Sequence, residues 1–314
     1  MTFSFVFPGQ GSQSVGMMNG YAGLPVIQET FSEASDILEQ DLWSLVSNGT
    51  ADDLNLTVNT QPIMLTAGIA VYRAWMDLGG TKPAIIAGHS LGEYTALVAA
   101  GALSFADALA LVRYRAQAMQ QAVPEGTGGM AAILGLDDAI IETICRDITA
   151  QSNSESLEPA NFNAPGQVVI AGHKNAIQQG IELAKTKGAK RAIMLPMSIP
   201  SHCSLMKPAA EQMKQQLEKV PLHAPDLPIL HNADVKSHTN PATIKDRLVQ
   251  QLVSPVRWVD TIRAIAATGV THVVECGPGK VLAGLNKRID QNLQQLSLAD
   301  SEAITQAVNQ LKVN

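Results

Sequence analysis

The chain has 314 residues, of which 46% are hydrophobic and 16% are charged. A chain of this length buries a large core without a disulfide or a metal, and this composition excludes an intrinsically disordered protein. Only 4% of the residues are aromatic and the net charge is −6. These values argue against a stacking platform for single-stranded nucleic acid and against a protein that binds duplex DNA or RNA.

The N-terminus and the cysteines favour a cytoplasmic protein. The first residues lack the positive region and apolar stretch of a signal peptide, and no apolar run reaches the roughly 18 residues of a membrane span. Cys145, Cys203 and Cys276 are far apart and show no CxxC pattern. We therefore expect reduced thiols, with no metal and no cofactor.

The first part of the chain predicts a parallel α/β sheet. Hydrophobic spacing predicts, in chain order, a buried strand at 3–7, helices at 25–40 and 62–78, a short strand at 84–87, a helix from about 91 and a helix to about 123. Pro62 suits a first helical turn, and Ser104 with Asp107 predicts a capping box. Strand, turn and helix in this order are typical of a parallel sheet with helical crossovers.

Residues 128–197 have a different pattern. They predict strands at 130–134, 160–163, 168–171 and 191–195, and helices at 139–149 and 175–187, with a polar loop at 151–158. This order is that of the split, ferredoxin-like βαββαβ unit. Beyond it, helices from about 205, 243 and 258 and strands at 227–230 and 272–276 predict that the large sheet resumes. We therefore expect a small domain inserted into a larger one.

The segment GHSLG, residues 88–92, fits the nucleophile elbow GxSxG. In an elbow, a sharp turn from strand to helix exposes the serine oxygen, and the glycines let the backbone approach closely. The pattern alone is weak, but here the apolar segment AIIA precedes it and a helix follows. Ser90 is therefore the leading candidate nucleophile, and a glycine-rich turn with an idle serine is the alternative.

A serine needs a base, which is usually a histidine. His202, in MSIPSHCS, lies where the chain re-enters the large sheet, and His231 is the second candidate. His89 adjoins Ser90, so its side chain is expected to point elsewhere around the turn. Cys203 is a further possible nucleophile, but nothing nearby in the sequence indicates an activated thiolate.

Two more segments are candidates for binding groups. The small residues of FPGQGSQ, residues 7–13, expose backbone N–H groups that suit an oxyanion hole or a phosphate cradle, although the segment lacks a P-loop lysine. A tight structural turn is the alternative. Arg113 and Arg115 face different sides of one helix, and spacing does not decide which, if either, reaches the site.

Charge is unevenly distributed along the sequence. No Lys or Arg precedes Arg73, whereas seven basic residues and only two acidic residues lie between Lys185 and Lys219. This basic stretch is either a solvated helical surface or a docking patch for an acidic partner.

Several motifs in order, FPGQGSQ, GHSLGE, RYRAQAM, NFNAPGQVVIAG, SIPSHCSLMKP and ECGPGKVLAGL, closely resemble the malonyl-CoA:acyl carrier protein transacylases of bacterial type II fatty acid synthesis. The resemblance covers about residues 1–290 and is shared, less closely, by acyltransferase domains of polyketide synthases. His231, in LPILHNADV, stands where an amide or a small residue is expected.

The resemblance implies an α/β fold. Its α/β-hydrolase-like core with a parallel sheet would comprise residues 1–127 and 198–314, and its ferredoxin-like subdomain residues 128–197. It also implies roles for six residues: Ser90 as nucleophile, His202 as general base and acid, the N–H groups of Gln10 and Leu91 as oxyanion hole, Arg115 as partner of the malonyl carboxylate, and the Gln251 carbonyl as the group that orients His202.

The implied activity is transfer of a malonyl group from malonyl-CoA to the phosphopantetheine thiol of acyl carrier protein, with the acidic carrier docking on the basic stretch. A monomer is expected. A Ser–His thioesterase or esterase is the alternative enzyme, and an idle module that binds acyl groups or carrier protein is the alternative from another class.

Overall fold

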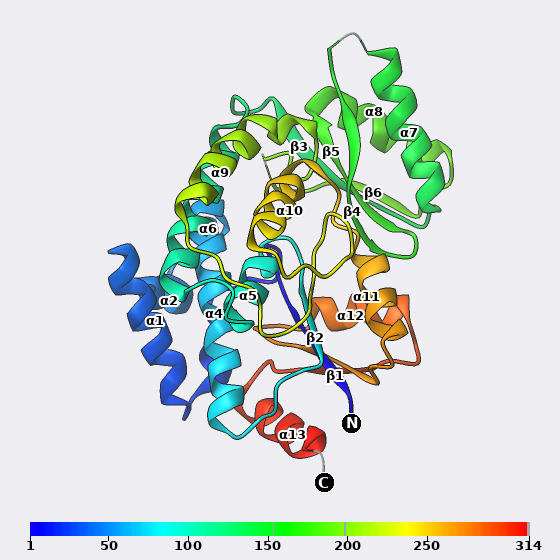
Figure 1. Ribbon diagram of the computed structural model, residues 1–314. Helices are drawn as coiled ribbons and strands as arrows, with labels where there is room; N and C mark the ends of the chain where they lie inside the picture. Colours follow the sequence, from blue (N-terminus) through cyan, green and yellow to red (C-terminus); the bar gives the residue numbers. More distant parts are fainter. Residues whose placement is uncertain (153, 198, 313–314) are drawn as a thin grey trace.

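The computed structural model describes residues 1–152, 154–197 and 199–312, which form two sheets covered by helices (Figure 1). The large sheet is parallel, with the order β7-β2-β1-β8-β9. Its strands are β1 (Phe3–Phe7), β2 (Ile85–Gly88), β7 (Ile229–Leu230), β8 (His272–Glu275) and β9 (Gln294–Ser297). The helices associated with it are α1 (Pro25–Leu38), α2 (Leu42–Asn48), α3 (Ala51–Asn55), α4 (Thr57–Asp77), α5 (Gly92–Ala99), α6 (Phe105–Gln121), α9 (Lys207–Lys219), α10 (Pro241–Val253), α11 (Trp258–Ala267), α12 (Val281–Ile289) and α13 (Ser301–Leu311).

The central strand β1 determines where the site forms. All five of its residues are buried, as expected for a strand between two parallel neighbours with both faces covered. Phe7 pairs in register with Gly88 at the end of β2. Because parallel strands end at the same edge of a sheet, the FPGQGSQ segment and the GHSLG turn leave the sheet side by side.

Helix α4 differs from its prediction. It begins at Thr57, five residues before Pro62, so the predicted start at 62 is wrong. The Thr57 hydroxyl accepts a hydrogen bond from Gln61 Nε2 at 2.9 Å, which stabilises the added turn. Pro62 is the sixth residue of the helix, so its missing N–H removes one intrahelical hydrogen bond. By contrast, Ser104 is confirmed as the N-cap of α6, since its Oγ accepts from Asp107 N at 3.0 Å. Asp107 Oδ2 accepts from the Ser104 hydroxyl at 2.6 Å instead of from the Ser104 main-chain N–H, so the predicted capping box is formed only in part.

The small sheet is antiparallel, with the order β4-β5-β3-β6, which is the ferredoxin-like arrangement that the sequence predicted. It comprises β3 (Gly128–Leu134), α7 (Asp138–Gln151), β4 (Leu157–Ala164), β5 (Gln167–His173), α8 (Lys174–Thr186) and β6 (Arg191–Met194). In β3, Ala131 and Ile133 belong to the core shared with α7 and α8, whereas Met130 and Ala132 face a cavity on the other side. Residues 157–158, predicted as loop, belong to β4.

The C-terminal part contains elements that the sequence did not predict. Strand β9 is a half-exposed edge strand with the polar sequence QQLS, which lacks the apolar alternation of a predicted strand. Helix α13 is also not predicted, and in the N-terminal part the same holds for the short helices α2 and α3. The strand expected at 227–230 shortens to Ile229–Leu230, because Pro228 has no backbone donor for a ladder.

Cys145, Cys203 and Cys276 are buried and free. In the part of the chain that the structure describes, no helix has the length and apolar character needed to cross a membrane.

Candidate active site

A cavity of about 400 Å³ lies between the carboxyl edge of the large sheet and the small sheet. Ser90, His202 and Arg115 line it from the side of the large sheet, and Met130 and Val169 line it from the small sheet. Arg115 and His202 are buried in its wall, which strengthens the electrostatic interactions that they make.

Ser90 lies in the turn between β2 and α5, and its φ of 51° places it in the left-handed region. The turn is tight because the flanking residues are glycines: a Cβ on Gly88 would lie 1.9 Å from the carbonyl carbon of Gly92. Asn232 closes the turn from behind. Its Oδ1 accepts from Ser90 N at 2.7 Å and its Nδ2 donates to the Gly88 carbonyl at 2.7 Å. The Ser90 hydroxyl therefore faces the cavity from a rigid backbone.

His202 lies directly opposite this hydroxyl, with its Nε2 2.7 Å from Ser90 Oγ. Its Nδ1 lies 2.8 Å from the main-chain carbonyl of Gln251. A carbonyl can only accept, so Nδ1 carries the proton and the lone pair of Nε2 points at the serine. Burial, and then the positive charge of Arg115, lower the pKa of His202 to about 3. The imidazole is thus neutral and able to accept a proton.

This lowered pKa predicts the pH dependence of the first chemical step. Free His has a pKa of about 6.5, so an ordinary base would be protonated and inactive at pH 5. Because the folded pKa of His202 is lower, kcat/KM for the acyl donor should change less than about threefold between pH 7 and pH 5. Rapid-quench measurement over this range tests the point, and an acidic limb with a midpoint near 6.5 would contradict it. Because the folded state disfavours protonated His202, the free energy of unfolding should decrease as the pH falls from about 6.5 towards the folded pKa of about 3.

Arg115, on α6, is 1% exposed and points its guanidinium at the same hydroxyl. Its Nη1 donates to Gln61 Oε1 at 2.8 Å, and its Nη2 donates to Gln251 Oε1 at 2.9 Å and to Ser90 Oγ at 3.3 Å. The ring of Tyr94 lies 5.5 Å from the guanidinium carbon. Among the described residues no carboxylate forms an ion pair with Arg115. It is therefore available for a carboxylate on a ligand.

The neighbouring arginine lies elsewhere, which answers the question that helical spacing left open. Arg113 hydrogen-bonds the side chain of Gln40 and does not line the cavity. Two positions along a helix are separated by roughly 200° around its axis, so only one of the two can face the site.

Gln10 and Leu91 line the cavity next to Ser90. Within the described ranges, neither of their main-chain N–H groups donates a hydrogen bond to another protein group. Gly9 allows the two segments to approach, since a Cβ there would lie 2.4 Å from the His89 carbonyl oxygen. Two free N–H groups beside a serine hydroxyl suit a developing oxyanion.

The other sequence candidates lie apart from this chemistry. His89 points at the small sheet, where its Nε2 lies 2.8 Å from Asn163 Oδ1. Cys203 donates to the Pro200 carbonyl, and burial raises the pKa of its thiol to about 12, so it is not a thiolate nucleophile. His231 is fully buried, and its Nδ1 lies 2.7 Å from Glu93 rather than beside Ser90.

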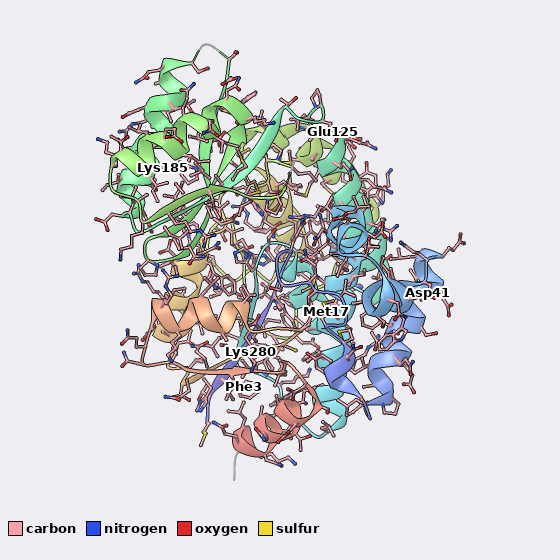
Figure 2. All side chains as sticks on the ribbon, turned by 180° about the vertical axis from the view of Figure 1, so that it is seen from behind. Phe3, Met17, Asp41, Glu125, Lys185 and Lys280 are labelled. Carbon is pink, nitrogen blue, oxygen red and sulfur yellow. The ribbon has the colours of Figure 1, made fainter. Side chains whose placement is uncertain are left out.

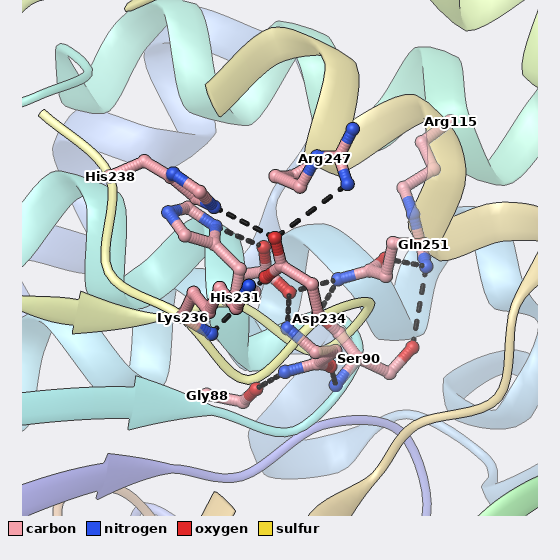
Figure 3. A network of polar contacts seen from close by, with 11 residues as sticks. Gly88, Ser90, Arg115, His231, Asp234, Lys236, His238, Arg247 and Gln251 are labelled. Carbon is pink, nitrogen blue, oxygen red and sulfur yellow. Dashed lines mark hydrogen bonds and ion pairs between the residues drawn. The ribbon is translucent and has the colours of Figure 1, made fainter. Parts of the chain in front are cut away.

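Sequence reasoning missed four polar residues that hold the site together: Gln61, Glu93, Asn232 and the side chain of Gln251. Figure 3 shows Gln251 between this network and Arg115. One signal was available. Asn232 follows the carboxyl end of a short strand, at the edge where the elbow also lies, and such positions commonly carry functional side chains. Nothing in the sequence marks Gln61, because it lies in a long buried helix.

This fold and this cavity define the acyltransferase class, and the profile of the family described as "Acyl transferase domain" matches residues 4–306. The malonyl CoA-acyl carrier protein transacylase of Salmonella typhimurium is 52% identical over 309 residues, which cover 98% of this chain and 99% of the relative. The solved acyl-carrier-protein S-malonyltransferase of Burkholderia pseudomallei is 58% identical, with a TM-score of 0.96 over 98% of this chain and 100% of its own. The chain belongs to the malonyl CoA-acyl carrier protein transacylase family.

A further solved structure shows a malonyl-transacylase in complex with a type II PKS acyl-carrier protein. It is 45% identical, has a TM-score of 0.96, and covers 99% of this chain and 100% of its own. The α/β core with its parallel sheet and small subdomain is thus the fold of the family, as the resemblance implied.

Proposed function

We propose that this chain transfers a malonyl group from malonyl-CoA to the phosphopantetheine thiol of acyl carrier protein, through a malonyl ester on Ser90, and so supplies malonyl carrier protein for fatty acid synthesis. One observation carries the proposal. Ser90 Oγ lies 2.7 Å from His202 Nε2 and 3.3 Å from Arg115 Nη2 in a single cavity. A nucleophile, its base and a buried cation for a carboxylate are therefore within reach of one small acyl group.

In the first half-reaction, Ser90 Oγ attacks the thioester carbon and His202 Nε2 takes the hydroxyl proton. The carbonyl oxygen becomes an oxyanion that the N–H groups of Gln10 and Leu91 stabilise, each contributing about 3 kcal/mol to lowering the barrier. The intermediate then collapses, the carbon–sulfur bond breaks, and the leaving coenzyme A thiol receives the proton from His202. The Gln251 carbonyl holds the imidazole in the required tautomer, as a carboxylate does in a Ser-His-Asp triad.

The second half-reaction reverses these steps with a different thiol. The pantetheine thiol of the carrier gives its proton to His202 and attacks the malonyl ester. The ester bond to Ser90 breaks, and the serine oxygen recovers the proton from His202. The chemistry is ping-pong, because one acyl group occupies Ser90 between the two thiols.

The site's position supports a division of the chain into a core, residues 1–127 and 198–314, and an inserted subdomain, residues 128–197. The cavity is lined from both parts. A monomer is sufficient for the proposed chemistry, since Ser90, His202 and Arg115 come from one chain. The monomeric state and the cytoplasmic location stay predictions.

The basic stretch supports docking of an acidic carrier on the small subdomain. Its residues divide between two places: Lys185, Lys187, Lys190 and Arg191 lie at the end of α8 and the start of β6, whereas Lys207, Lys214 and Lys219 lie on α9 (Figure 1). Lys185 is exposed on the subdomain (Figure 2). Strand β6 leads directly to Leu195, Pro196 and Met197, which line the cavity. A carrier bound beside β6 would place its flexible arm near the site.

Charge reversal tests this surface. Replacement of Lys185, Lys187 and Lys190 by glutamate should raise KM for holo acyl carrier protein about tenfold, with KM for malonyl-CoA unchanged, because long-range attraction mainly favours encounter with the acidic partner. The control with the same change in net charge replaces three exposed lysines outside the stretch: Lys82, Lys236 and Lys312. An equal rise in KM for both substrates would assign the lysines to coenzyme A phosphates instead.

Product analysis separates transfer from hydrolysis. The chain is mixed with malonyl-CoA and holo carrier, and the products are resolved by mass. The proposal expects malonyl carrier and free coenzyme A in equal amounts. Free malonate formed at the same rate with or without carrier would make this chain a thioesterase, and binding of malonyl-CoA without either product would make it a binding module.

A further inference from the structure

Behind Ser90 lies a buried carboxylate that no step of the proposed reaction uses. Glu93 is in the first turn of α5 and is fully buried. Its Oε2 accepts hydrogen bonds from Asn232 N at 3.0 Å and from Gln251 Nε2 at 2.8 Å, and its Oε1 lies 2.7 Å from His231 Nδ1. These contacts belong to the polar network shown in Figure 3. A buried carboxylate with three such partners organises the groups around it.

The bond to Gln251 determines which way its amide faces. The NH₂ group of Gln251 donates to Glu93 and to the Ser90 carbonyl, the latter at 3.0 Å, so its oxygen must face Arg115. A reversed amide would present NH₂ to a guanidinium, which has only donors, and would leave Glu93 facing an amide oxygen. Glu93 is thus the acceptor that selects the orientation that Arg115 requires.

The bond to Asn232 connects Glu93 to the nucleophile. The Asn232 main-chain N–H donates to Glu93, while its side chain closes the turn around Ser90. One carboxylate therefore holds both the residue behind the serine and the residue beside the arginine.

Glu93 also provides charge balance at a useful separation. Arg115 is buried, and a buried cation without a compensating charge is costly. Glu93 carries the opposite charge, but the Gln251 amide lies between the two groups. A carboxylate in direct contact would compete with an acyl carboxylate for the guanidinium. Because one amide separates the two groups, the charge of Arg115 is balanced and its guanidinium can still bind the carboxylate of an acyl group.

His231 holds the far oxygen of Glu93. Within the described ranges its Nε2 has no hydrogen-bond partner, so Nδ1, facing the carboxylate, is the polar contact of the ring. The ring of His238 lies 5.5 Å away and hydrogen-bonds Asp234, which also pairs with Arg247. None of these three bonds Glu93. His231 is therefore the side chain that restrains its Oε1.

We propose that Glu93 and His231 are positioning residues for selection of a carboxylate-bearing acyl group: His231 holds Glu93, and Glu93 holds the Gln251 amide with its oxygen on Arg115. The inference rests on the proposed function, and it assigns His231 a role other than that of base.

Glu93→Gln tests the inference with little change in shape. The new amide has one acceptor oxygen where the carboxylate has two and carries no charge, so the contacts of Gln251 and His231 are no longer both made to an acceptor, and the Gln251 amide is held less firmly against Arg115. The ratio of kcat/KM for malonyl-CoA to that for acetyl-CoA should fall about 30-fold, the scale of one hydrogen bond to a charged group, through a higher KM for malonyl-CoA. A purely structural role would lower kcat/KM equally for malonyl-CoA and acetyl-CoA. The ratio would then stay unchanged, and this result would overturn the inference.

Two substitutions at His231 give a second test that does not depend on the folding of the Glu93 variant. His231→Asn places an amide NH₂ where Nδ1 lies and should keep the ratio within about threefold of the wild type. His231→Leu removes the donor and should lower the ratio as Glu93→Gln does. The matched control is His238→Asn, which alters the neighbouring ring without touching Glu93. A wild-type ratio in His231→Leu would overturn the inference.

The wild-type chain, measured in parallel, distinguishes the two possible failures. If the wild type transfers malonyl and every variant keeps the wild-type ratio of kcat/KM for malonyl-CoA to that for acetyl-CoA, only the positioning role of Glu93 and His231 is contradicted. Absence of malonyl transfer in the wild type removes the proposed function and, with it, this inference.

Discussion

Replacement of Ser90 by alanine is expected to abolish the malonyl-enzyme and to lower malonyl transfer by about 10⁴-fold or more. Ser90 Oγ is the only hydroxyl shown within hydrogen-bond distance of both His202 and Arg115 among the described residues. Without it, the acyl group has no acceptor on the chain, and the ping-pong route is closed. Intact-protein mass after mixing with malonyl-CoA measures the adduct directly.

The control for this prediction is Ser237→Ala, which removes an exposed hydroxyl outside the cavity and should leave the adduct unchanged. The Ser90 variant should remain folded, because the backbone N–H of residue 90 still donates to Asn232. An adduct that persists in Ser90→Ala on another residue would contradict the assignment of the nucleophile.

Replacement of Arg115 by alanine is expected to remove most of the preference for malonyl over acetyl, about a 10³-fold change in the ratio of their kcat/KM values. A buried guanidinium forms a strong ion pair with a ligand carboxylate, whereas an acetyl group leaves it unpaired. Arg115→Lys should restore little of the preference, since an ammonium lacks the planar fork that Gln61 and Gln251 hold in place.

Arg113→Ala is the matched control, because it removes an arginine from the same helix that bonds Gln40 instead of facing the cavity. Its selectivity should equal that of the wild type. The Arg115 variant leaves two buried amide oxygens without their donor, so its thermal stability is measured beside its kinetics. An unchanged malonyl preference in a folded Arg115→Ala variant would show that another group binds the acyl carboxylate.

Much of the fold follows from local patterns. The ferredoxin-like order of the small sheet is predictable because short apolar runs mark β3, β5 and β6, with a weaker signal for β4. Strand β9 was not, because an edge strand with one exposed side has little apolar signal. The start of α4 is mispredicted because proline is typical of a first helical turn, whereas Pro62 is the sixth residue of this helix.

The candidate site likewise contains residues that the sequence predicts and residues that it does not. Ser90 is recognisable because the elbow is a local pattern of backbone geometry. Residues of the network, such as Glu93 and Asn232, act across 139 positions of sequence, and no local pattern encodes a contact of that separation. The basic stretch shows the converse: neighbours in sequence divide between α8, β6 and α9 in space.

The most direct measurement is the mass of the intact chain after brief mixing with malonyl-CoA, followed by addition of holo acyl carrier protein. We expect a single malonyl adduct on Ser90 that disappears as malonyl carrier forms. An adduct that decays to malonate at a rate independent of the carrier, or a carrier that becomes malonylated while the chain never carries an adduct, would contradict it.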